Sequence, residues 1–184
     1  MACFLLSNEV RAVKKEYDSQ LSSRPANIRE LALVVREVCE WFAFSLEAKD
    51  YDFHEREDLQ SMCVLATAVL AMVYATFGID VTFISGAYRK RNCSKKPAKF
   101  PHCYLELDKE GVRVDITATQ FHIPDKVYIT PLDSSGCYIE GTVIQSFKQL
   151  LWLWDESHVH VSQDIVRLYR MAVERLVGKP SAAK

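Results

Sequence analysis

The 184-residue chain is predicted to fold as one α+β domain, a helical layer packed on a small antiparallel sheet. Three observations support this fold class. The first 77 residues contain three stretches with apolar side chains at helical spacing, and residues 101–121 alternate apolar and polar positions on either side of a turn. Two more helical stretches follow before Gly178. We expect residues 1–178 to form the domain and residues 179–184 to be a disordered tail.

The composition is that of an ordinary globular protein. Hydrophobic residues make up 49% of the chain, charged residues 26%, and the net charge is −1. This balance gives no general reason to expect a nucleic-acid or membrane partner. The longest apolar run, Val64–Ile79, is short for a membrane span. The six cysteines have no CxxC spacing, so we expect a cytoplasmic protein with reduced thiols.

Three helices are expected in the first 77 residues. The first runs from Ser7 to about Leu21, and the second begins after Asn27, which resembles the start of a capping box with Glu30. The third begins at Leu59 or Ser61 and ends at Phe77, before a glycine. It is apolar on almost every side, which predicts a helix at the centre of the fold.

The rest of the chain is expected to supply the sheet and two closing helices. The sequence predicts strands at Ile79–Ser85 and near Val127–Ile129, and helices at Thr142–Trp154 and Ser162–Leu176. Tyr88–Phe100 is expected to be a basic loop, and its positive residues are Arg89, Lys90, Arg91, Lys95, Lys96 and Lys99.

Residues 101–121 predict a β-hairpin whose turn is Asp108–Gly111. A two-residue or a four-residue loop gives the same register, in which paired residue numbers sum to 219. That register places Glu106 opposite Arg113, a favourable pair of charges. It also places His102 and Asp115 on one face as diagonal neighbours, with Cβ atoms roughly 7 Å apart. A three-residue loop would put them on opposite faces.

Cys63, His102 and Asp115 form a candidate catalytic triad. A cysteine near the start of a helix lies at the positive end of the helix dipole, which favours the reactive thiolate. Histidine can take the thiol proton and return it to a leaving amine, and the carboxylate orients the imidazole. The backbone N–H of Cys63 could form part of an oxyanion hole, with Gln60 as a second donor.

His102-x-Tyr-x-Glu, followed by Val-Asp115-Ile-Thr-Ala-Thr-Gln120-Phe121, is similar to the Asp-x-Thr-x-x-Gln-Phe stretch of bacterial and phage transglutaminase-like cysteine hydrolases, a branch of the papain-like superfamily. The resemblance covers residues 60–121. It implies a papain-like core and a thioester intermediate. The flank Ser-Met-Cys63-Val-Leu-Ala differs from both Gly-x-Cys-Trp of animal transglutaminases and Cys-Gly-Ser-Cys-Trp of papain.

We therefore expect a thiol protease or amidase that cleaves an amide bond of a protein or peptide and needs no cofactor. Two alternatives are a transglutaminase or deamidase acting on protein glutamine, and a catalytically silent binding or effector protein on the same fold. The oligomeric state stays open.

Other residues have smaller candidate roles. Thr117, Gln120 and Tyr104 are candidates for bracing the site or binding substrate, and His122 is a rival base. His158 and His160 are expected in a turn between the closing helices, and His54 in a polar loop. Cys93, His102, Cys103 and His122 could in principle be the ligands of a zinc site. Because neighbouring residues of a strand point to opposite faces, we expect no metal there.

Overall fold

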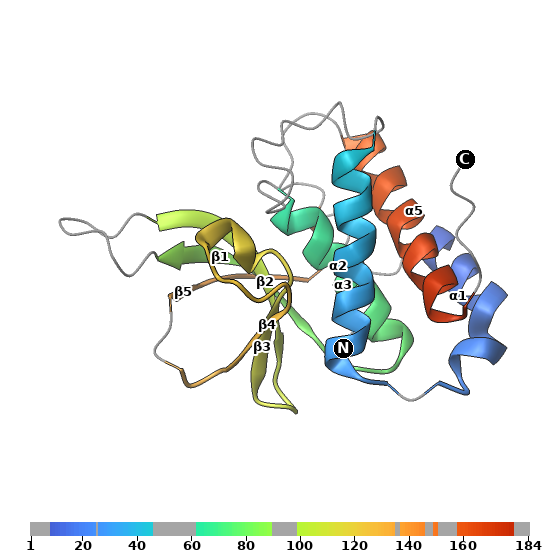
Figure 1. Ribbon diagram of the computed structural model, residues 1–184, viewed down its shortest axis with the longest axis horizontal. Helices are drawn as coiled ribbons and strands as arrows, with labels where there is room; N and C mark the ends of the chain where they lie inside the picture. The colour runs from blue at the N-terminus through green and yellow to red at the C-terminus, as the bar shows by residue number, and fades with distance from the viewer. Residues whose placement is uncertain are drawn as a thin grey trace.

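The computed structural model describes residues 8–24, 26–45, 62–89, 99–134, 137–145, 149–150 and 158–178. Over these residues the chain is α+β, with helices on one side of the molecule and an antiparallel sheet on the other (Figure 1). The longer helices are α1 (Asn8–Leu21), α2 (Ile28–Phe44), α3 (Cys63–Thr76) and α5 (His158–Leu176). No helix in this part of the chain is both long and apolar enough to cross a membrane.

Helices α1 and α2 confirm the sequence prediction. The Asn27 side chain accepts a hydrogen bond from the backbone N–H of Glu30 at 3.0 Å, so α2 begins at the predicted N-cap. Its buried residues, among them Leu31, Val35 and Phe42, recur at helical spacing and face the core.

Helix α3 is the central helix of the fold. Every residue from Leu65 to Tyr74 is buried, and α3 contacts α2, α5, β1 (Thr82–Arg89) and β2 (Lys99–Leu107). The chain leaves α3 through Gly78, whose φ of 73° lies in the left-handed region that glycine adopts without strain. The predicted start at Leu59 or Ser61 lies outside the described residues, and Cys63 is the first residue of the helix.

The five-stranded sheet has the order β4-β3-β2-β1-β5, and every neighbouring pair is antiparallel. Its other strands are β3 (Val112–Asp115), β4 (Tyr128–Pro131) and β5 (Tyr138–Ile144).

The predicted hairpin register is confirmed. Glu106 pairs with Arg113, and the Arg113 Nε donates to Glu106 Oε1 at 2.8 Å. The loop is the four-residue one, closed by a bond from the Gly111 N–H to the Asp108 carbonyl, with Gly111 at a φ of 67°.

The two faces of β2 have different environments. Cys103, Leu105 and Leu107 belong to the hydrophobic core shared with the helices. Because side chains alternate along a strand, His102 and Tyr104 lie on the other face. Both are buried there, at 2% and 1% exposure. The candidate catalytic histidine therefore occupies a second interior of the protein, built from aromatic and polar side chains.

Two glycines bring β5 unusually close to β1. Gly86 pairs with His102 across β1 and β2, and a Cβ atom at Gly86 would clash with the Ile139 carbonyl. A Cβ atom at Gly141 would clash with the Ser85 backbone, beside a register shift between Ser85 and Ala87. This close approach allows Tyr138, the first residue of β5, to pack near the buried His102.

Several predicted boundaries were wrong. The helix predicted at Thr142–Trp154 begins too early, because Thr142–Ile144 belong to β5, where their β-branched side chains are favoured. Gln149 and Leu150 are helical, and the following residues lie outside the described part of the chain.

The first strand begins at Thr82 instead of Ile79, and Tyr88 lies in this strand instead of the basic loop. The last helix begins at His158, so His158 and His160 are helical and not in a turn. Hydrophobic spacing located these elements, but their ends depend on partners far along the chain.

Candidate active site

Cys63 occupies the first position of α3, where the helix meets β2. Its N–H has no acceptor within the helix, because an acceptor would have to lie four residues earlier. The next turn is tied to β2 by the Thr67 hydroxyl, which donates to the Cys103 carbonyl at 3.1 Å. The thiol is partly buried and not in a disulfide.

His102 and Asp115 form a buried pair. Nε2 of His102 lies 2.6 Å from Oδ2 of Asp115, and both side chains are almost completely shielded from solvent. Asp115 is the last residue of β3, so the hairpin register brings the two residues onto one face. With Nε2 bound to Asp115, Nδ1 is the nitrogen that can exchange a proton with a thiol or a substrate.

Asp115 accepts hydrogen bonds from more than its histidine. Its Oδ1 accepts from the Thr117 N–H at 2.7 Å and the Thr117 hydroxyl at 3.0 Å, the pattern of an Asx-turn at the end of a strand. Its Oδ2 also accepts from the Tyr138 hydroxyl at 2.8 Å. The carboxylate is thus fixed by groups from the turn after β3 and from β5.

Gln120 lies on the other side of the imidazole. Its Nε2 is 3.2 Å from His102 Nδ1, and the short helix η4 (Ala118–Phe121) positions it. An amide group can serve either protonation state of the ring, because its nitrogen donates to a bare Nδ1 and its oxygen accepts from a protonated one.

Tyr104 is buried beside His102. It is 1% exposed, its hydroxyl donates to the Ile139 carbonyl at 3.3 Å, and its ring lies 6.4 Å from the His102 ring.

Cys63 has the electrostatic environment of a reactive thiol. A hydrogen bond from Cys103 lowers the pKa of Cys63, burial raises it, and the hydrogen bond and charge of His102 lower it further. The net pKa of Cys63 lies well below the usual value for a thiol. The pKa of Cys103 is raised by its hydrogen bond with Cys63 and by burial. We assign the negative charge to Cys63 because Cys63 has a positive partner and a helix start beside it.

The imidazole and carboxylate favour the same charged state. Burial opposes the charge on His102, but the charge and hydrogen bond of Asp115, together with those of Cys63, outweigh it and raise the pKa of His102 to about 10. Burial would likewise raise the pKa of Asp115, but the charge and hydrogen bond of His102, together with Thr117 and Tyr138, keep it below its usual range. These shifts favour a thiolate at Cys63 and an imidazolium at His102 beside the Asp115 carboxylate.

Aromatic rings enclose His102. The Phe121 ring meets it edge-on at 4.8 Å, and Tyr138 and Tyr88 lie 6.2 Å and 6.4 Å away. Tyr88 also stacks on Phe121 at 3.9 Å. This packing restricts the imidazole to one orientation and excludes water from its Nε2 side.

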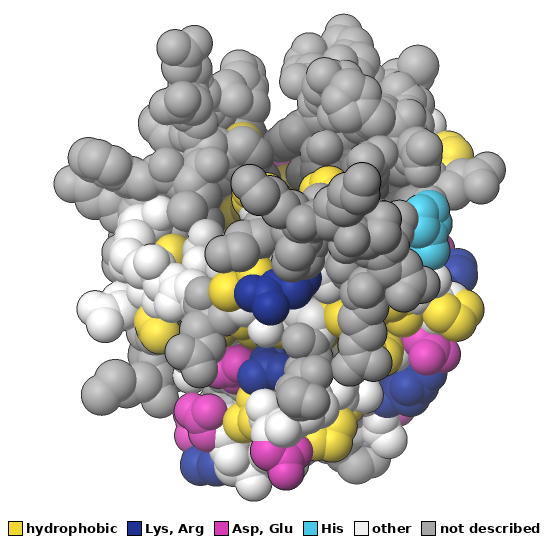
Figure 2. All heavy atoms as spheres, turned by 90° about the vertical axis from the view of Figure 1, so that its left-hand side faces the viewer, with side chains coloured by type: hydrophobic (Ala, Val, Ile, Leu, Met, Phe, Trp, Pro, Cys, Tyr) yellow, Lys and Arg dark blue, Asp and Glu magenta, His cyan; other side chains and the backbone are white. Residues whose placement is uncertain are grey.

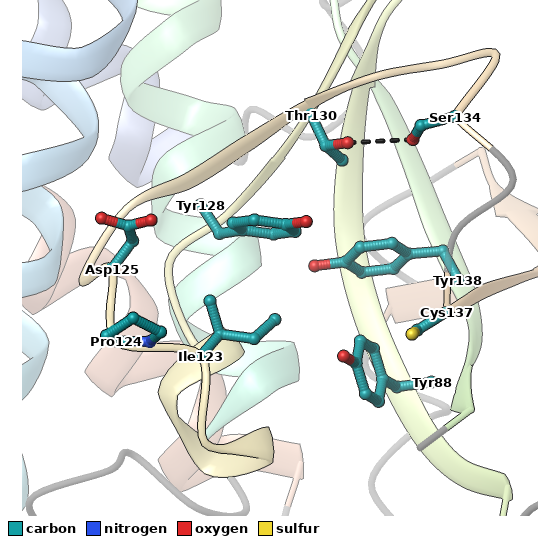
Figure 3. Close-up of a pocket in the computed structure, with 9 residues that line it drawn as sticks. All are labelled: Tyr88, Ile123, Pro124, Asp125, Tyr128, Thr130, Ser134, Cys137 and Tyr138. Atoms are coloured by element: carbon teal, nitrogen blue, oxygen red, sulfur yellow. Dashed lines mark hydrogen bonds between the residues drawn. The ribbon is translucent and has the colours of Figure 1, made fainter. Parts of the chain in front are cut away.

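A pocket of about 290 Å³ adjoins the aromatic cluster. Figure 3 shows Tyr128 and Tyr138 entering it from opposite sides with their hydroxyls toward each other, and their rings lie 6.3 Å apart. Asp125 and Cys137 also line the pocket. The described residues that line the pocket include neither Cys63 nor His102. Tyr138 connects the pocket to the candidate triad, because it lines the pocket and its hydroxyl donates to Asp115.

Other residues named from the sequence do not join this site. Gln60, His54 and Cys93 lie outside the described residues. His122 is exposed at the end of η4, with a φ of 64°, and takes no part in the hydrogen bonds of His102 and Asp115. Within the described ranges, no cluster of three or more His, Cys, Asp or Glu side chains could hold a metal ion.

Of the predicted basic loop, only residues 88, 89, 99 and 100 lie within the described ranges, and they belong to β1 and β2. Acidic and basic side chains both occur on the described part of the face that the sheet presents (Figure 2). That part of the face therefore has no single sign of charge.

Sequence reasoning missed two residues of the site. Tyr138 lies 23 residues beyond Asp115, on a strand whose pairing with β1 leaves no local pattern. Cys103 was interpreted as a small buried hydrophobe, and it is buried, but it also lowers the pKa of Cys63. Comparison of the chain with models of protein families, with curated proteins and with solved structures found no match.

Proposed function

We propose that the protein is a cysteine-nucleophile hydrolase that cleaves an amide bond of a protein or peptide through a thioester. The observation that carries the proposal is the buried hydrogen bond between His102 Nε2 and Asp115 Oδ2. The same imidazole helps to lower the pKa of Cys63. A helix-borne thiol, a strand-borne imidazole and an orienting carboxylate are the parts that thiol acyl transfer requires. The resemblance of residues 60–121 to transglutaminase-like hydrolases points to the same chemistry.

In the acylation step the Cys63 thiolate attacks the carbonyl carbon of the substrate, and the carbonyl oxygen takes the negative charge. The Cys63 N–H, without an acceptor in α3, is a donor to that oxyanion. The Nδ1 proton of His102 passes to the leaving amine as the C–N bond breaks. Asp115 stabilises the imidazolium until this transfer and fixes the tautomer afterwards.

In the deacylation step a water molecule gives a proton to Nδ1 and attacks the thioester carbon. The C–S bond then breaks, which releases a carboxylic acid and restores the thiolate and imidazolium. A protein amine in place of water would give acyl transfer, and a glutamine side chain as the substrate would give deamidation.

The influence of His102 on the pKa of Cys63 supports catalysis over a silent binding role. A protein that only binds has no need for a thiol of lowered pKa beside a carboxylate-backed histidine, and such buried charges are costly to keep.

The proposal is tested by iodoacetamide labelling read by peptide mass spectrometry. Cys63 should react rapidly below about pH 8, where ordinary thiols are protonated. Cys137, which is also partly exposed, is the reference thiol in the same sample. In His102→Ala the Cys63 rate should fall to that of Cys137. Equal rates for the two cysteines in the wild-type protein would contradict the proposal.

Intact-mass analysis of candidate protein substrates then identifies the reaction. Cleavage gives fragments, deamidation a small gain in mass, and acyl transfer a covalent adduct. Each product should be absent with Cys63→Ala, provided that circular dichroism shows this variant folded. Turnover that persists in folded Cys63→Ala would exclude Cys63 as the nucleophile.

A further inference from the structure

Oδ2 of Asp115 is shared between two donors. His102 Nε2 lies 2.6 Å from it and the Tyr138 hydroxyl lies 2.8 Å from it. Over the described part of the chain, the other partner of the carboxylate is Thr117, which binds Oδ1. Tyr138 thus competes with the histidine for the negative charge of one oxygen atom.

We propose that Tyr138 is a positioning residue of the Cys63–His102–Asp115 site, whose hydroxyl limits how strongly Asp115 holds the proton on His102. The inference rests on the proposed function for its consequence in catalysis, but its physical content concerns the titration of His102 alone.

The Tyr138 hydroxyl is a permanent donor. Burial, followed by the charge of Asp115, strongly raises the pKa of Tyr138. The phenol therefore keeps its proton at neutral pH. A charged acceptor makes such a hydrogen bond short and strong, in accord with the 2.8 Å distance.

The ring of Tyr138 is fixed by packing that does not involve its hydroxyl. Tyr104 and Tyr88 meet it edge-on at 4.8 Å and 5.4 Å, and the Arg113 guanidinium lies over it at 5.6 Å. The glycines that bring β5 against β1 allow this approach. Removal of the oxygen alone should leave the ring in place.

Without the Tyr138 hydroxyl, the negative charge of Asp115 Oδ2 should interact more strongly with His102. Asp115 Oδ2 then has His102 as its side-chain donor, and the imidazolium becomes a weaker acid. We expect the His102 titration to move upward by about half a pH unit or more, since one unit corresponds to about 1.4 kcal/mol. A weaker acid protonates the leaving amine more slowly, so turnover should fall while substrate affinity stays similar.

The test follows the His102 ring nitrogens by NMR across pH in Tyr138→Phe and in protein carrying 3-fluorotyrosine at position 138. The more acidic fluorophenol binds Asp115 more strongly, so it should shift the His102 titration downward, opposite to Tyr138→Phe. Tyr128→Phe is the matched control, because Tyr128 lines the same pocket and Tyr138 is the tyrosine that donates to Asp115. It should leave the titration unchanged.

A His102 titration unmoved in both Tyr138 variants, with only the melting temperature altered, would overturn the inference and leave Tyr138 a packing residue. The fluorotyrosine protein keeps the test valid if Tyr138→Phe does not fold. Failure of the proposed function is a separate result, an ordinary alkylation rate for Cys63 in the wild-type protein, and leaves the NMR experiment intact.

Discussion

Two consecutive residues of β2 lower the pKa of Cys63. Cys103 does so through a hydrogen bond, and His102 through its hydrogen bond and its positive charge. These neighbours lie on opposite faces of the strand, so the sulfur meets both the hydrophobic core and the polar interior.

Replacement of Cys103 by alanine should make Cys63 less reactive. Loss of the thiol donor should raise the Cys63 pKa, so the pH profile of its alkylation rate should move upward by about one unit. Cys39→Ala is the control, because Cys39 is buried in α2 and its pKa of about 12 is raised mainly by burial. Equal rates for the two variants would show that Cys103 is only a filler of the core.

At the residue scale, the sequence could predict the His102–Asp115 contact but not the Tyr138 or Cys103 contacts. A hairpin has one register for a given loop, and charge pairing of Glu106 with Arg113 selects it. Tyr138 reaches Asp115 only because β5 crosses to the far side of β1, a pairing that no local pattern encodes.

Among the elements, α2 is connected to the turn after Asp115 by Arg36. Arg36 is 1% exposed, and its Nη1 donates to the Ile116 carbonyl at 2.5 Å and the Thr119 hydroxyl at 3.0 Å. Its Nε donates to Glu40 at 2.9 Å. Because Ile116 directly follows Asp115, one buried guanidinium ties the helical layer to the turn that holds the carboxylate.

We expect Arg36→Met to destabilise the protein by about 2 to 3 kcal/mol, because a buried carbonyl loses a charged donor. It should also slow Cys63 alkylation, since the Asp115 turn is no longer held. Urea unfolding and labelling measure the two effects. Arg29→Met, an exposed change on the same helix, should alter neither. Normal stability in Arg36→Met would mean that the turn is held by its own hydrogen bonds.

At the same scale, helix prediction succeeded where one face is apolar or a cap is present, as in α2 with Asn27. It was wrong for Thr142–Ile144, whose apolar spacing also fits a strand. β-Branched side chains and a partner strand decided the outcome.

In the whole molecule, the two-layer architecture follows from the sequence because each layer has its own signal: the apolar α3 and the alternating hairpin. Strand order does not follow, because it depends on which edges remain available after the hairpin has formed. The sheet adds β4 beside β3 and β5 beside β1, and the second of these additions completes the environment of Asp115.

The pH dependence of the free energy of unfolding reports the charge states of His102 and Cys63. His102, with its pKa raised to about 10, contributes stability that is complete below about pH 6.5 and declines as the pH rises through 10. Cys63, with its pKa lowered, contributes stability that is complete above about pH 9 and declines as the pH falls. Between these limits the folded pair and the unfolded chain each bind one proton, so the two dependences cancel.

We therefore expect the free energy of unfolding of the wild-type protein to be nearly independent of pH from about 6.5 to 8.5, as far as this pair is concerned. In Cys63→Ala the His102 contribution is no longer offset, so the free energy should fall by about 1.4 kcal/mol per pH unit relative to wild type. Urea titrations at intervals across this range measure the difference. The double variant Cys63→Ala, His102→Gln should restore a flat profile, whereas parallel profiles for wild type and Cys63→Ala would mean that His102 is uncharged in folded Cys63→Ala.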